Sequence, residues 1–163
     1  MKTTFFWKKG WFKQTSEIYA QNTRIGTLTE KTWSNSATGE INGKKYHFQT
    51  QGFLKQNTLI IDGENNSVIG HINYNSWMTR AKVEYAGGTA DWKYNNNWNT
   101  KWRLTGTNGT QIDFYGHANK GKIECNNQDD LLILTGLYIT NYYWQITLAI
   151  LIAVFIPLWL SAT

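Results

Sequence analysis

The chain has 163 residues, with 16 basic and 11 acidic side chains and a formal net charge of +5. Its single proline and nine tryptophans argue against a disordered or collagen-like chain. The only cysteine, Cys125, excludes an internal disulfide and cannot build a metal site alone. All charged side chains lie between Lys2 and Asp130, and residues 131–163 carry none. The sequence therefore joins a charged body to an apolar tail.

Alternating apolar and polar residues dominate the body and predict β-strands. Tight-turn pairs separate the runs: Asn42-Gly43, Asp62-Gly63, Gly87-Gly88 and Asn108-Gly109. The predicted strands are 3–8, 15–20, 24–31, 36–41, 44–50, 57–61, 67–74, 79–85, 89–94, 100–105, 110–115 and 120–125.

A longer repeat organises these strands, since Ile25-Gly26 recurs as Ile69-Gly70 and Trp33 recurs as Trp77. The spacing predicts a mainly-β fold, a twelve-stranded antiparallel closed barrel made of three four-strand repeats, in which the tail replaces the last strand of the third. Strand side chains alone do not fill so wide a barrel, so something apolar must occupy its centre. The tail is the only candidate.

The repeated Ile-Gly, Trp and Asn-Gly features, followed by an apolar helix after Asp129-Asp130, resemble the Tubby C-terminal-like superfamily, which includes the phospholipid scramblases and the LURP-one-related proteins. The resemblance covers residues 3 to about 145. It implies a twelve-stranded barrel around a central, C-terminal hydrophobic helix. The phosphoinositide-binding lysines of Tubby and the calcium segment of scramblases have no match here, so the resemblance implies no binding residues.

The tail predicts one helix over residues 129–162, which would span about 50 Å at 1.5 Å per residue. That length exceeds both a short barrel and a bilayer core of about 30 Å. We therefore expect residues 1–145 to form the barrel with its helical core, and residues 146–163 to continue as a transmembrane segment. Residues expected in the interface belt are Tyr142, Tyr143 and Trp144 where the helix leaves the body, and Trp159 at the far side. The alternative is a soluble protein with the whole helix buried in the barrel.

Counting alternate turns brings one set of loops to the barrel end from which the helix would leave. These loops carry aromatic and basic residues, which suit the lipid headgroup region. The residues predicted to face the membrane are Lys9, Trp11, Phe12, Lys13, Trp33, Phe53, Lys55, Trp77 and Trp98. In the alternative arrangement these aromatic side chains fold inward and plug the barrel mouth.

The sequence offers no catalytic constellation. His47, His71 and His117 are isolated from other metal-ligating residues, and no glycine-rich phosphate loop is present. We therefore expect no enzymatic activity, no cofactor and no metal. Trp92-Lys93-Tyr94 and Lys101-Trp102-Arg103 resemble stacking platforms for single-stranded nucleic acid, but the membrane tail makes nucleic acid an unnatural partner.

The predicted function is a membrane-associated, non-enzymatic barrel that binds acidic lipid headgroups, with membrane lipids as its partners. We expect a single-pass C-terminal anchor and a body in the cytoplasm. The alternatives are a scramblase-like protein that moves lipids and a soluble structural or interaction protein.

Overall fold

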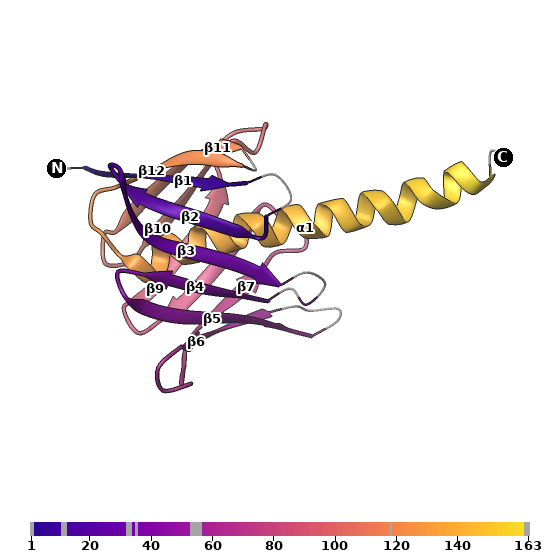
Figure 1. Ribbon diagram of the computed structural model, residues 1–163. Helices are drawn as coiled ribbons and strands as arrows, with labels where there is room; N and C mark the ends of the chain where they lie inside the picture. Colours follow the sequence, from indigo (N-terminus) through magenta and orange to yellow (C-terminus); the bar gives the residue numbers. More distant parts are fainter. Residues whose placement is uncertain are drawn as a thin grey trace.

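The computed structural model describes residues 2–10, 13–31, 34, 36–52, 57–117 and 119–161, in a barrel of strands and one long helix (Figure 1). The strands are β1 (Thr3–Lys9), β2 (Thr15–Ala20), β3 (Thr23–Lys31), β4 (Ser36–Ile41), β5 (Lys44–Gln51), β6 (Asn57–Asp62), β7 (Val68–Tyr74), β8 (Arg80–Tyr85), β9 (Gly88–Tyr94), β10 (Lys101–Gly106), β11 (Gln111–His117) and β12 (Lys120–Cys125). The helix is α1 (Asp130–Ser161).

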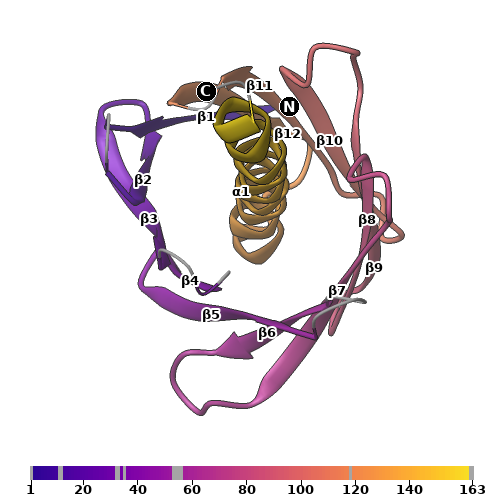
Figure 2. The same cartoon turned by 90° about the vertical axis from the view of Figure 1, so that its right-hand side faces the viewer.

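The strands form a closed antiparallel barrel in chain order, so each strand pairs with its neighbours in sequence. Pairing of β1 with β12, from Thr3 opposite Cys125 to Lys8 opposite Lys120, closes the ring. Viewed along the helix, the strands surround α1 (Figure 2). The mainly-β, twelve-stranded barrel around a C-terminal helix is therefore confirmed, with every predicted strand boundary within two residues of the observed one.

The residues of the turns explain why the ends of the strands can be predicted from short sequence segments. Asn42 and Gly43 have φ angles of 50° and 80°, the left-handed conformation that a two-residue hairpin turn requires. The turn after β6 is longer, and the Asp62 carboxylate accepts hydrogen bonds from the backbone N–H groups of Glu64 and Asn65 at 2.8 and 3.2 Å. Both of these turns use residue types that tolerate their backbone geometry.

The internal repeat has a structural counterpart in the two Ile-Gly pairs. A Cβ atom on Gly26 would lie 2.5 Å from the carbonyl oxygen of Glu40, and one on Gly70 would lie 2.6 Å from that of Glu84. Both glycines also lie next to a register shift, in the β2–β3 pair and in the β6–β7 pair. Glycine is required at both positions because the neighbouring backbone approaches closely.

The core lies between the strands and the first half of α1. Buried side chains alternate along most strands, and buried helix residues face them on all sides from Leu132 to Ile139. Gly136 packs directly beneath the Phe114 ring, and a Cβ atom on Gly39 would lie 2.9 Å from Leu134. Two glycines, one on the helix and one on the wall, therefore allow the close fit of helix and barrel.

The helix enters the barrel at the end where Asp129 and Asn42 meet it. The Asp129 carboxylate caps α1 by accepting the Leu132 N–H at 3.0 Å, and Asn42 donates to the Asp130 carboxylate at 2.8 Å. We call this the entry end; its turns are 21–22, 42–43, 63–67, 86–87, 107–110 and 126–129. The opposite, exit end has the described connections 75–79 and 95–100.

The barrel covers only part of the helix. Tyr143 is the last buried residue of α1, and from Trp144 onward the described side chains are exposed or half-buried. Figure 1 shows the helix continuing straight beyond the exit end. Burial of the whole helix, the basis of the soluble alternative, is therefore wrong, because the strands are too short to cover it.

Candidate membrane-facing site

The projecting half of α1 is apolar around its circumference. It exposes Leu148, Ile150, Leu151, Ile152, Val154, Phe155, Ile156, Trp159 and Leu160. The segment Asp130–Pro157 is long and apolar enough to cross a membrane, with a mean hydropathy of 1.6. Within it, only 17% of the 18-residue stretch that meets this criterion is buried, so packing in the barrel accounts for little of that stretch's apolar surface.

Two of the residues expected at a membrane interface lie elsewhere. Tyr142 and Tyr143 are 3% and 2% exposed, and they belong to the barrel core. Tyr142 stacks on Tyr74 of β7, with ring centroids 4.2 Å apart. Their predicted position is corrected because the barrel is tall enough to cover the helix through residue 143. Trp144 and Trp159 are exposed, at 59% and 75%.

The loop between β7 and β8 is held by the side chain of Asn75. Its Oδ1 accepts the backbone N–H groups of Thr79 and Arg80 at 2.9 and 3.0 Å, and its Nδ2 donates to the Thr79 hydroxyl at 3.1 Å. Met78 has a φ of 53°, which closes the turn. Trp77, at the middle of this turn, is 84% exposed.

The loop between β9 and β10 has the same construction around Asn96. Its Oδ1 accepts the N–H groups of Thr100 and Lys101 at 3.1 and 3.0 Å, and its Nδ2 donates to the Thr100 hydroxyl at 2.7 Å. Asn99 has a φ of 54°, matching Met78. Trp98 is 86% exposed. We call these two turns, residues 75–80 and 96–101, the asparagine-clipped loops.

The first asparagine-clipped loop is also joined to the helix. The Tyr143 hydroxyl donates to the backbone carbonyl of Arg80 and lies 3.4 Å from the Asn75 Oδ1. Tyr143 is the residue immediately before the exposed Trp144. The loop that carries Trp77 is therefore fixed to the point where α1 leaves the barrel.

The other residues predicted to face the membrane fall into three groups. Lys9 is mostly buried and forms an ion pair with Glu30, so its charge is already neutralised. Lys13 is exposed. The remaining residues lie outside the described part of the chain: Trp11, Phe12, Trp33, Phe53 and Lys55.

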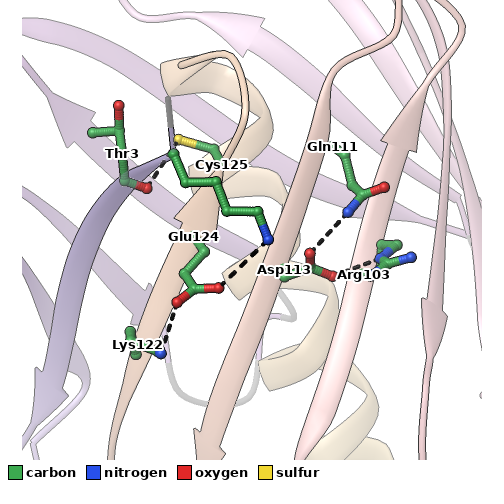
Figure 3. A network of polar contacts seen from close by, with 8 residues as sticks. Thr3, Arg103, Gln111, Asp113, Lys122, Glu124 and Cys125 are labelled. Carbon is green, nitrogen blue, oxygen red and sulfur yellow. Dashed lines mark hydrogen bonds and ion pairs between the residues drawn. The ribbon is translucent and has the colours of Figure 1, made fainter.

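Much of the charge on the outer surface is paired within the protein. On β10 to β12, Arg103 donates to Asp113, and Lys122 donates to Glu124 at 2.7 Å (Figure 3). Gln111 also donates to Asp113, at 2.9 Å. These charged groups are paired with one another, so the outer face of β10 to β12 has little unpaired charge with which to bind a ligand.

Several cations near the exit end differ from that network. Arg80, Lys93 and Lys101 are exposed, and within the described ranges none of them forms an ion pair with an acidic side chain. Arg80 and Lys93 are also directly opposite each other on β8 and β9. Like charges at such positions repel, so this pair costs folding free energy rather than contributing to it. Both border an open groove of about 610 Å³.

The described residues contain no group of three or more histidine, cysteine, aspartate or glutamate side chains arranged to hold a metal ion. His47 contacts the Thr38 hydroxyl at 3.2 Å across β4 and β5, a pairing on the barrel wall. Cys125 is buried, and burial raises the pKa of its thiol, which keeps it in the unreactive protonated form.

Comparison of the chain with models of protein families, with curated proteins and with solved structures finds no match. The candidate site consists of the exposed helix from Trp144, the asparagine-clipped loops with Trp77 and Trp98, and the unpaired cations beside them.

Proposed function

We propose that the protein is a membrane-anchored, non-enzymatic β-barrel whose exit end faces the bilayer and binds acidic lipid headgroups. One observation carries the proposal: the helix that fills the barrel continues without a break into an uncharged, apolar segment that the described residues leave largely exposed. Residues 144–161 of an α-helix extend about 27 Å, close to the hydrocarbon thickness of a bilayer. Insertion in a membrane would bury this surface.

The exposed cations support acidic headgroups as the ligand. Arg80 and Lys93 repel each other across β8 and β9, and a phosphate or carboxylate group between them would remove that cost. Anionic lipids attract basic residues near the surface by roughly 1 kcal/mol for each lysine or arginine. We propose the cytoplasmic side for the body, because basic segments beside a span favour that side.

A scramblase-like activity is less well supported by the helix. Lipid transfer requires a polar path for headgroups, and the exposed half of α1 offers few polar groups for one. The Thr147 hydroxyl donates to the Tyr143 carbonyl of the same helix at 2.9 Å, so its polarity is satisfied internally. On architecture alone, we also propose a relationship to the Tubby C-terminal-like superfamily.

Two experiments test the proposal. The full chain should remain in membranes after alkaline carbonate extraction, whereas residues 1–145 should become soluble. The 1–145 fragment should then float with vesicles of phosphatidylserine and phosphatidylcholine, and not with phosphatidylcholine alone, with binding that weakens as salt increases. An Arg80→Gln, Lys93→Gln variant should bind the acidic vesicles less, while the matched entry-end variant Lys44→Gln, Lys45→Gln should bind normally. Equal flotation on both vesicle types would refute the headgroup proposal.

A further inference from the structure

The two asparagine-clipped loops share more than their shape. Each has the order Asn, any residue, Trp, any residue, Thr and a basic residue, from Asn75 to Arg80 and from Asn96 to Lys101. Each presents its tryptophan almost fully to solvent at the exit end. A single exposed tryptophan needs no explanation, but two in matching, internally bonded turns at one end indicate a common use.

The fold does not need these two indole rings. Trp77 and Trp98 are absent from the hydrophobic core, whereas Trp92 and Trp102 lie within it. The hydrogen bonds that hold the turns come from the asparagine and threonine side chains, so the indole rings take no part in them. The turns therefore hold the two tryptophans in place, but the indole rings do not stabilise the turns.

We propose that the asparagine-clipped loops are preorganised anchors that place Trp77 and Trp98 in the interfacial zone of the bilayer crossed by α1. Tryptophan favours that zone because its ring is apolar and its N–H is polar. A turn that is already fixed loses little conformational entropy when its side chain inserts. Arg80 and Lys101, three residues after each tryptophan, provide cations suited to lipid phosphate groups.

The hydrogen bond from Tyr143 adds a constraint on orientation. Because the Tyr143 hydroxyl binds the Arg80 carbonyl, the first loop moves with the helix. With α1 crossing the bilayer and two loops in contact with its surface, the barrel has three attachment points. It would then hold a fixed tilt on the membrane rather than swing about its helix. This inference rests on the proposed membrane span.

The test uses the full chain in liposomes of phosphatidylcholine and phosphatidylserine, on a Cys125→Ser background. A nitrobenzoxadiazole label is placed at Ser76→Cys or at Asn97→Cys, both exposed and each beside its tryptophan, with Glu64→Cys at the entry end as the control. Dithionite added outside should reduce the labels at 76 and 97 at least about fivefold more slowly than the label at 64, because the interface shields them. The Asn75→Ala change should restore fast reduction at position 76.

The outcomes separate this inference from the proposed function. If the chain resists carbonate extraction but all three labels are reduced equally fast, the loops do not touch the membrane and the inference is wrong, while the anchor stands. If the chain is extracted by carbonate, both fail. If a single-stranded oligonucleotide shields positions 76 and 97 in detergent while liposomes do not, the face binds nucleic acid and the inference is again wrong.

Discussion

The hydroxyl of Tyr143 donates a hydrogen bond to the backbone carbonyl of Arg80, which joins the helix to the first residue of β8. Tyr143 is the last helical side chain inside the barrel, and Arg80 ends the loop that exposes Trp77. The contact therefore marks the level at which α1 changes from the core of the barrel to an apolar rod outside it.

Removal of that hydroxyl should loosen the exit end. We expect Tyr143→Phe to lower the free energy of unfolding by about 1–2 kcal/mol, because a buried hydrogen bond is lost while the ring packing remains. Denaturant unfolding of the full chain in detergent measures the change. The control is Tyr19→Phe, whose half-buried hydroxyl donates to the Glu17 carboxylate and should matter less. Equal losses in the two variants would contradict a special role for Tyr143.

Gly136 should be intolerant of any side chain. In most helices Gly→Ala stabilises by up to about 1 kcal/mol, but here the new Cβ would overlap the Phe114 ring. We expect Gly136→Ala to lower the free energy of unfolding by about 1–3 kcal/mol, as overpacked cores do. In a double-mutant cycle, Phe114→Leu should offset part of this loss. Simple additivity of the two changes would show that the helix and β11 do not fit as described.

The barrel should need only the part of α1 that lies inside it in order to fold. A chain ending at residue 130 lacks the buried helical side chains from Leu132 to Tyr143, so we expect no cooperative unfolding and no near-ultraviolet dichroism from ordered aromatics. A chain ending at 145 keeps them and should unfold cooperatively. Circular dichroism of the two fragments makes the comparison. A folded, soluble 1–130 fragment would show that the strands alone form the core.

Strong alkali should destabilise the barrel. Burial raises the pKa of Tyr94 to about 12 and also raises that of Tyr74. The unfolded chain has a tyrosine pKa of about 10, so the folded state favours the protonated phenol. This stabilisation is complete below pH 10 and is lost as the pH rises through about 12.

Denaturant unfolding measured from pH 9 to pH 12 should show this decline in stability. The Tyr94→Phe variant, which has no phenol to titrate at that position, should show a shallower one. An identical pH dependence in the variant would assign the decline to other groups.

The strands were predictable because their signals are local. Alternation fixes the inward face of each strand, and pairs such as Asn42-Gly43 fix its end. The closed barrel followed from the strand count and the need to cover edges. The start of the helix was equally local, since Asp129 supplies the capping carboxylate at the first turn.

The site was less predictable because it depends on positions in space. Tyr142 and Tyr143 are of a residue type that is common at membrane interfaces. Only the height of the barrel shows that they are core residues. The sequence predicts Lys9 on the membrane-facing rim, but Lys9 is paired with Glu30, which lies two strands away. The two asparagine-clipped loops were not identified from the sequence. Aligning residues 75–80 with residues 96–101 would have found them, because both segments have Asn, Trp, Thr and a basic residue at the same spacing.

In the proposed arrangement one helix is both the barrel core and a membrane span, with the change at Tyr143–Trp144. Spin labels on single cysteines along α1, in the full chain reconstituted in liposomes with Cys125→Ser, test it through collisions with oxygen and with a water-soluble nickel complex. We predict high oxygen and low nickel accessibility at positions 148, 152 and 156, and low accessibility to both at 134 and 139. High nickel accessibility at 148, 152 and 156 would place this segment in water and exclude a membrane span.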